Sequence, residues 1–158
     1  MSEIWLIPAF PLLGFLLNGF FGKRFGEGFV SFIGPMSVGL AFAQTLVIFF
    51  QMMEKKGNII HEHLYSWISS GNFEVGINFY FDRLSGLYIL IITGVGFLIH
   101  IYSVGYMRGD PGFYRFFSYL NLFIFFMLIL VLGDNFLVMF VGWEGVGLCS
   151  YLLIGYYF

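Results

Sequence analysis

One acidic residue lies in the middle of a long apolar stretch near the end of the chain. Residues 136–158 read FLVMFVGWEGVGLCSYLLIGYYF, and Glu144 is the only carboxylate among them. A helix rises ~1.5 Å per residue and the hydrocarbon core of a bilayer is ~30 Å thick, so Glu144 would lie near mid-depth in a membrane span. A charge at that depth costs at least ~2.5 kcal/mol, and we therefore expect this residue to have a function.

A carboxyl group in an apolar span is suited to taking up and releasing protons. Desolvation stabilises its neutral form and an approaching cation stabilises its charged form, so a moving lysine would switch it between the two. We predict that Glu144 is a proton relay; the alternative is a structural, protonated group that hydrogen-bonds a neighbouring helix. The apolar spans contain no lysine or arginine, so the sequence does not identify a basic partner for this carboxylate.

The neighbours of Glu144 form two faces if residues 136–158 are helical. Small residues on a helix allow another helix to approach closely in lipid, and we interpret the single cysteine, Cys149, as such a packing residue. We expect both faces to contact other helices. At ~100° per residue, Glu144 shares its face with Phe140, Gly147, Leu148 and Tyr151, while the opposite stripe holds Gly142, Gly145, Val146 and Cys149.

Histidines provide the other candidates for chemistry. His100 lies within the apolar residues 84–106, and imidazole exchanges protons near neutral pH, so it is either a second proton relay or a structural histidine bonded to a carbonyl. His61 and His63 would share one face of an extended segment, a spacing found in zinc sites. The sequence supplies no clear third and fourth ligands, so we predict no metal site and interpret both residues as part of a solvated loop.

Five apolar stretches separated by polar residues must position these groups. They predict an all-α membrane protein, a single membrane domain that is a bundle of about five transmembrane helices. In the loop between the second and third helices, residues 73–81 are apolar at every odd position and follow a turn signal at 69–72, which predicts a small β-hairpin on the outer side. The predicted helices cover about residues 4–21, 29–53, 84–106, 116–132 and 136–158.

The composition agrees with a membrane protein and excludes several other classes. Of the 158 residues, 59% are hydrophobic and 10% are charged, which is too few charges to cover a soluble domain of this size. The net charge of −2 gives no sign of nucleic-acid binding. The chain has no glycine-rich nucleotide turn between a strand and a helix and no set of cysteines for a cluster, so we predict that it carries no cofactor.

The basic residues give an expected orientation in the membrane. The positive-inside rule counts lysine and arginine in short loops, and it favours an N-terminus on the outside with the first and third connecting loops in the cytoplasm. The N-terminus lacks a basic region and a cleavage site, so we expect the first span to be retained. The cytoplasmic side would hold Lys23, Arg24, Arg108 and Arg115, and the outer side Lys55, Lys56 and Arg83.

Several stretches together resemble one family. These are GVGFLIHIYSVGYM at residues 94–107, YLNLF at residues 119–123 and GWEGVGLCSYLLIG at residues 142–155. They are similar to subunit L of proton-translocating NADH:quinone oxidoreductase, the respiratory complex I, and the similarity covers nearly the whole chain. Subunits of this family are several times longer, so the resemblance implies that the sequence is the N-terminal part of a longer, antiporter-like subunit.

The resemblance implies a function and partners. Glu144 matches a glutamate that forms a charged pair with a lysine on a later helix, and His100 matches a histidine of the family pattern. The expected role is proton translocation coupled to quinone reduction, in a multi-pass subunit of the cell inner (plasma) membrane, beside the lipid and other membrane-arm subunits of the enzyme. Two alternatives remain: the large subunit of a multisubunit sodium/proton antiporter, and a truncated, non-conducting structural fragment.

Overall fold

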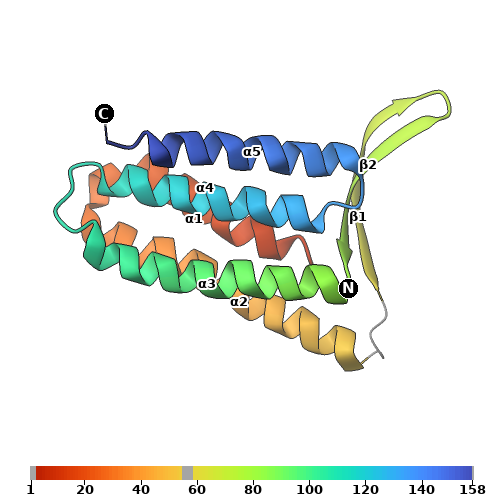
Figure 1. Ribbon diagram of the computed structural model, residues 1–158, viewed down its shortest axis with the longest axis horizontal. Coiled ribbons are helices and arrows are strands. Elements are labelled where there is room, and N and C mark those ends of the chain that lie inside the picture. The colour runs from red at the N-terminus through yellow and green to blue at the C-terminus, as the bar shows by residue number, and fades with distance from the viewer. Residues whose placement is uncertain (1–2, 55–58, 158) are drawn as a thin grey trace.

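A computed structural model describes residues 3–54 and 59–157. Within these residues it has five helices and one two-stranded hairpin, which confirms the predicted membrane bundle with a hairpin between the second and third helices (Figure 1). All five helices are long and apolar enough to cross a bilayer. In chain order the elements are α1 (Leu6–Phe25), α2 (Glu27–Glu54), β1 (Ile60–Ser70), β2 (Phe73–Phe81), α3 (Arg83–Tyr106), α4 (Phe113–Leu132) and α5 (Phe136–Ile154).

The first helix ends later than the sequence predicted. α1 continues past residue 21 to Phe25, so Lys23 and Arg24 lie in its last turn instead of a loop. Positive side chains at this end of a helix interact favourably with its unpaired carbonyl groups, which explains why the polar residues do not end it. Gly26 ends the helix with a φ of 81°, a conformation that glycine adopts without strain.

The fourth and fifth helices also differ from their predicted bounds. α4 begins at Phe113 rather than at 116, after a short turn in which the Asp110 carboxylate accepts a hydrogen bond from the N–H of Gly112. α5 ends at Ile154 rather than at 158. The chain then leaves the helix, and Tyr156 packs into a buried cluster with residues of α2 and α4. The bounds of α2 and α3 lie close to the predicted ones.

The helices form a bundle in which α5 has the fewest neighbours. α1 packs against both α2 and α4, and α3 also packs against α2 and α4. α5 lies along α4 at one edge of the bundle, so that one side of α5 is left uncovered by the rest of the described chain (Figure 1). This helix carries Glu144.

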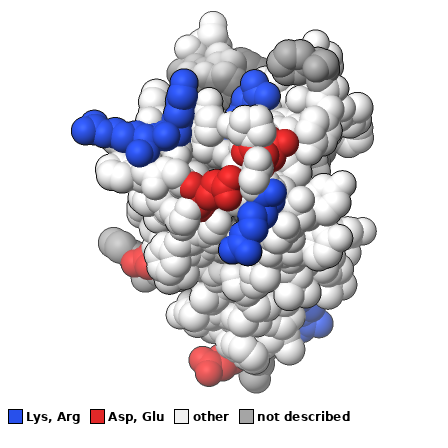
Figure 2. Space-filling view, turned by 90° about the vertical axis from the view of Figure 1, so that its left-hand side faces the viewer, with Lys and Arg blue, Asp and Glu red and all other residues white. Residues whose placement is uncertain are grey.

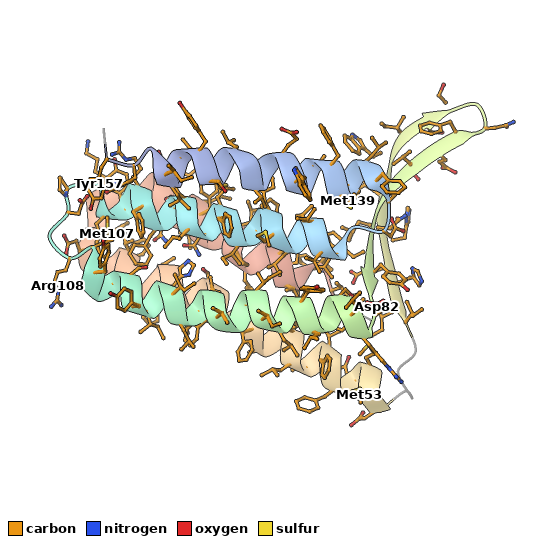
Figure 3. The ribbon with its side chains drawn as sticks, viewed as in Figure 1. Met53, Asp82, Met107, Arg108, Met139 and Tyr157 are labelled. Atoms are coloured by element: carbon orange, nitrogen blue, oxygen red, sulfur yellow. The ribbon has the colours of Figure 1, made fainter. Side chains whose placement is uncertain are left out.

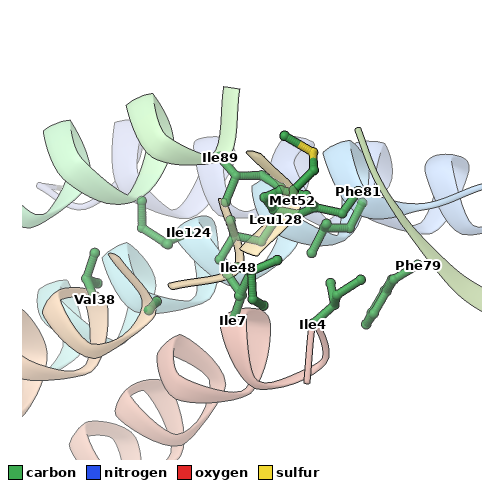
Figure 4. Packing of buried hydrophobic residues seen from close by; sticks show 12 residues of the cluster. Ile4, Ile7, Val38, Ile48, Met52, Phe79, Phe81, Ile89, Ile124 and Leu128 are labelled. Carbon is green, nitrogen blue, oxygen red and sulfur yellow. The ribbon is translucent and has the colours of Figure 1, made fainter. Parts of the chain in front are cut away.

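The largest apolar cluster lies where the helices meet the hairpin. Ile4 and Ile7 of the first segment, Ile48 of α2 and Leu128 of α4 are almost completely buried there, and the hairpin adds Phe81 (Figure 4). Fully burying an aliphatic or aromatic side chain contributes roughly 1.5–3 kcal/mol in water, but between membrane spans the gain comes from close packing rather than from removal of water. The cluster thus fastens the hairpin to the helix ends.

The predicted small hairpin is confirmed, and its second strand has the predicted bounds. β1 and β2 pair in an antiparallel register from Ile60 opposite Phe81 to Ser70 opposite Phe73, and the turn contains Gly71 with a φ of 61°. Two irregularities interrupt the pairing of β1. The tip of the hairpin extends beyond the bundle, whereas its base is joined to α4 through a bridge between Phe79 and Gly133 (Figure 1).

The hairpin also caps the first helix. Trp5, at the start of α1, provides no side-chain cap, and Oε2 of Glu62 in β1 accepts a hydrogen bond from the N–H of Ile4 at 2.6 Å. Partial burial raises the pKa of the Glu62 carboxyl group, while the backbone N–H groups of Ile4 and Trp5 oppose this rise. Glu62, which lies far along the chain, therefore satisfies the backbone N–H of Ile4 just before the start of α1.

The two ends of the bundle differ in charge. The turn between α1 and α2, the loop between α3 and α4, and the residues after α5 all lie at the end opposite the hairpin. Figure 2 looks at this end, where basic side chains surround acidic ones. Lys55 and Lys56, which enter the expected orientation, lie outside the described residues. The basic residues near the viewed end are Lys23, Arg24, Arg108 and Arg115, and the acidic ones are Glu27 and Asp110.

Candidate functional site

The small-residue stripe of α5 is the face that packs against α4. Gly142, Gly145 and Cys149 are buried there. A Cβ atom at Gly142 would lie 2.6 Å from both the N and Cα atoms of Leu130, and one at Gly145 would overlap the ring of Phe126. The backbones therefore approach too closely for any larger residue. This confirms the prediction that the small stripe contacts another helix.

Glu144 lies on the opposite, exposed face of α5. Its neighbours on that side include Phe140 and Leu148, which are 57% and 54% exposed. Gly147, one turn further along, has no atom within 4 Å of an added Cβ. The expected helix contact on this face is therefore absent among the described residues. Along the helix axis, Glu144 lies ~12 Å from the hairpin end of α5.

The Glu144 carboxylate has no partner within residues 3–54 and 59–157. No hydrogen bond or ion pair joins it to any residue of these ranges. Among the same residues, lysines and arginines lie at helix ends or in connections, and none lies at the depth of Glu144. A carboxylate in this position requires a donor or a cation from outside the described chain to be stable as a charged group in lipid.

The hairpin holds the start of α5. Asn135 caps the helix, because its Oδ1 accepts a hydrogen bond from the N–H of Val138 at 3.0 Å. Its Nδ2 donates to the carbonyl of Gly76 in β2 at 2.8 Å. The N–H of Asp134 also donates to the carbonyl of Asn78. One asparagine thus both begins the helix and ties it to the hairpin.

The other end of α5 is held by the loop between α3 and α4. Tyr156 donates a hydrogen bond from its hydroxyl to Oδ1 of Asp110 at 2.5 Å, and Tyr157 donates to Oδ2 at 3.3 Å. The Tyr156 ring is 6% exposed and stacks edge-on against Phe116. The guanidinium of Arg115 lies 5.3 Å from the centre of the same ring. Figure 3 shows Tyr157 and Met107 at this end, where the Tyr157 hydroxyl lies 3.7 Å from the Met107 sulfur.

His100 is buried inside the bundle. Its Nδ1 lies 2.7 Å from the carbonyl oxygen of Gly96, and because a carbonyl only accepts, Nδ1 must carry the hydrogen. The ring packs edge-on against Phe117 of α4. Its Nε2 has no hydrogen-bond partner among the described residues. The histidine therefore makes the hydrogen bond to a carbonyl that is expected of a structural histidine. Its Nε2 also remains available to accept a proton, which a proton relay requires.

The structure does not bring His100 and Glu144 together. His100 faces the interior between α3 and α4, whereas Glu144 faces away from α4. They also differ in depth, since His100 lies ~9 Å from the basic end of α3 and Glu144 lies near the middle of α5. Any proton exchange between them would need intervening groups.

Sequence reasoning missed a buried polar cluster that joins three helices. Nδ2 of Asn121 in α4 donates to Oγ of Ser37 at 2.6 Å and to the carbonyl of Gly34 in α2 at 3.2 Å. Asn18 in α1 donates to Oδ1 of Asn121 at 3.2 Å. Both asparagines are completely buried. Single asparagines within otherwise apolar spans were the available signal, because such residues commonly hydrogen-bond across helices.

The paired histidines of the outer loop lie in β1. His61 packs edge-on against the ring of Tyr80, and Nδ1 of His63 hydrogen-bonds Oδ1 of Asn78 at 2.5 Å. Both partners belong to β2. Within the described residues, no group of three or more His, Cys, Asp or Glu side chains converges as metal ligands do. The two imidazoles thus contribute to strand pairing in the hairpin.

Comparison with known proteins gives consistent matches. A family model described as NADH-Ubiquinone oxidoreductase (complex I), chain 5 N-terminus matches residues 67–117. The chain is 46% identical over its whole length to NADH-quinone oxidoreductase subunit L of Escherichia coli, and 48% identical to that of Pseudomonas aeruginosa, covering 26% of each. NADH-ubiquinone oxidoreductase chain 5 of Hypocrea jecorina is 43% identical, with 96% of this chain and 22% of the relative covered.

A solved structure shares the fold. A chain of the membrane-bound sulfane sulfur reductase, an archaeal respiratory membrane complex, superposes with a TM-score of 0.76 at 20% identity, covering 97% of this chain and 23% of that chain. At this identity the likeness concerns the fold alone. Five apolar helices in this arrangement, with one carboxylate in the middle of the fifth, define a multi-pass membrane bundle.

The sequence matches narrow this class to one family. The chain matches the N-terminal part of NADH-quinone oxidoreductase subunit L, also named chain 5, over its whole length. It spans about a quarter of the length of the curated relatives given above. The family resemblance seen in the three sequence stretches is thus confirmed.

Proposed function

We propose that the chain acts as the N-terminal part of a membrane-arm subunit of NADH:quinone oxidoreductase and takes part in proton translocation coupled to quinone reduction. The names of its relatives and its matching fold support this proposal. Its partners would be other membrane-arm subunits and the surrounding lipid. Nicotinamide and quinone chemistry would belong to other subunits, and this chain would contribute a membrane path for protons.

The placement of Glu144 carries the proposal. It is a single carboxylate near mid-depth on a helix whose opposite face is already occupied by α4. A structural carboxyl group would be expected to hydrogen-bond a neighbouring helix, but the neighbouring helix α4 packs on the other side. We infer that Glu144 holds and releases a proton in response to a cation from a part of the protein outside these residues.

His100 has a secondary place in the proposal. Its neutral ring presents Nε2 as an acceptor inside the bundle, so it would pass a proton only through water or a rearranged side chain.

The proposed orientation places the N-terminus and the hairpin outside the plasma membrane and the basic end in the cytoplasm. In that orientation, His100 lies in the cytoplasmic half of α3.

A substitution at Glu144 tests the relay. Glu144→Gln removes the ionisable group and keeps the size of the side chain, and Glu54→Gln at the exposed end of α2 is the matched control. Both are made in the full-length subunit, and inverted membrane vesicles are assayed for NADH oxidation and for acidification with a pH-sensitive dye. We expect Glu144→Gln to lower acidification by about a hundredfold, the usual loss for a removed acid–base group, with normal subunit assembly. Acidification equal to the control would refute the relay.

A further inference from the structure

Asp110 accepts hydrogen bonds from three donors, two of which belong to the segment that follows the Glu144 helix. Its Oδ1 accepts hydrogen bonds from the Tyr156 hydroxyl at 2.5 Å and from the N–H of Gly112 at 2.7 Å, and its Oδ2 accepts one from Tyr157 at 3.3 Å. These four residues form what we call the Asp110 cluster. Hydrogen bonds to a charged acceptor are stronger than neutral ones, so the carboxylate is the centre of this cluster.

The surroundings of Asp110 keep it charged. The hydrogen bond from Tyr156, followed by that from Gly112, lowers the pKa of the Asp110 carboxyl group, and Arg115 acts in the same direction. The pKa of the Tyr156 hydroxyl is raised, mainly by burial and then by this bond. Tyr156 therefore remains a donor and Asp110 an acceptor across the neutral range.

The same loop is held on its other side. The N–H of Gly109 donates to Oε1 of Glu27, at the start of α2, at 3.1 Å. The loop between α3 and α4 thus links the turn between α1 and α2 to the residues that follow α5. Figure 2 shows acidic groups between basic ones on this face. Arg115, Glu27 and the two tyrosines face the loop from its neighbours, and Lys23 and Tyr114 line a pocket together with Glu27 and Asp110.

We propose that Asp110 is a positioning residue for proton translocation: through Tyr156 it fixes the position of α5 and thereby the position of Glu144. α5 packs on α4 along one face only, through Gly142 and Gly145, and no other described helix supports its opposite face, so the attachment of its two ends limits how far the helix can tilt. Asn135 and Asp110 fasten its two ends. Glu144 lies ~15 Å from the Ile154 end, so a shift there moves the carboxylate as part of one rigid helix. This inference rests on the proposed role of Glu144.

The experiment compares four substitutions in the full-length subunit of the assembled complex. Asp110→Leu removes the acceptor and Asp110→Asn keeps one acceptor oxygen. Tyr156→Phe removes the donor but keeps the buried ring, and Tyr102→Phe on exposed α3 surface is the matched control. Inverted vesicles are assayed for NADH oxidation and acidification, and subunit content is measured in the purified complex. Glu144→Gln serves as the reference.

We expect Tyr156→Phe to lower acidification per NADH oxidised by about tenfold, as for loss of one charge-assisted hydrogen bond. Asp110→Leu removes this bond and two others, so it should lower acidification at least as much. Asp110→Asn should retain more acidification than Asp110→Leu. The double variant that combines Asp110→Leu with Tyr156→Phe should be no worse than the worse single one, because both substitutions remove the same bond. If Asp110→Leu prevents assembly, the isosteric Tyr156→Phe decides alone.

Two outcomes separate this inference from the proposed function. Normal acidification in Tyr156→Phe, together with loss in Glu144→Gln, overturns the role of Asp110 and leaves the relay standing. Normal acidification in Glu144→Gln overturns the relay, and with it the idea that the Asp110 cluster acts by positioning that carboxylate. A loss in Tyr156→Phe equal to that in the Tyr102→Phe control also overturns the positioning role.

Discussion

The close contact between α4 and α5 leads to a sharp prediction about Gly142. Its added Cβ would lie 2.6 Å from the N and Cα atoms of Leu130, and backbone atoms cannot move aside as the end of a side chain can. An ordinary contact needs 3.4–4 Å, so Gly142→Ala must push the two helices apart. Overpacking of this kind costs about 1–3 kcal/mol, while replacing glycine by alanine in a helix returns about 1 kcal/mol.

The expected net effect is a destabilisation of about 1 kcal/mol, with Gly147→Ala as the matched control. Gly147 belongs to the same helix but has nothing within 4 Å of an added Cβ, so alanine there should stabilise the chain slightly. Unfolding of the chain in micelles is followed by tryptophan fluorescence while dodecyl sulfate is added. If the two variants unfold at the same detergent fraction, the backbones of α4 and α5 do not approach at Gly142 and the reasoning is wrong.

Two further predictions concern polar contacts elsewhere in the bundle. Asn121→Leu removes three hydrogen bonds, to Asn18, Ser37 and the carbonyl of Gly34. Each such bond contributes ~0.6 kcal/mol in membrane proteins, so the free energy of unfolding in the same detergent titration should fall by about 2 kcal/mol. An unchanged unfolding midpoint would contradict the polar cluster. Glu62 has a raised pKa in the folded chain, so the folded form binds its proton more tightly and stability should fall as pH rises through the range just above 4.5. Thermal unfolding of Glu62→Gln should lack this part of the pH dependence; an identical pH profile would exclude Glu62 as its source.

Much of the fold was predictable because membrane spans impose a simple pattern. Apolar length alone indicated five helices, and the alternation in residues 73–81 indicated β2. β1 was harder, since its pairing is interrupted twice and its residues are mostly exposed, so that no strict alternation marks it. The predicted end of α1 was wrong because polar residues such as Lys23 can continue a helix. The predicted end of α5 was wrong because the chain leaves the helix at Gly155 and Tyr156.

The candidate site was predictable only in part. The type and depth of Glu144 follow from its position in an apolar stretch, and so does the use of the small stripe for packing. The sequence could not show which helices are neighbours. For that reason it did not reveal that Asn18 and Asn121 meet, or that Asp110 bonds Tyr156 across 46 positions of the chain. These contacts depend on the arrangement of whole helices.

The spacing of small residues around Glu144 explains why its carboxylate faces outward. Gly142 and Gly145 meet α4 so closely that a methyl group would not fit, and at ~100° per residue Glu144 points about 160° away from Gly142 and 100° from Gly145. A carboxylate cannot turn back into that contact. Since an unpaired charge in lipid costs at least ~2.5 kcal/mol, the same packing that fixes α5 on α4 obliges the carboxylate to find its donor or cation on the other side.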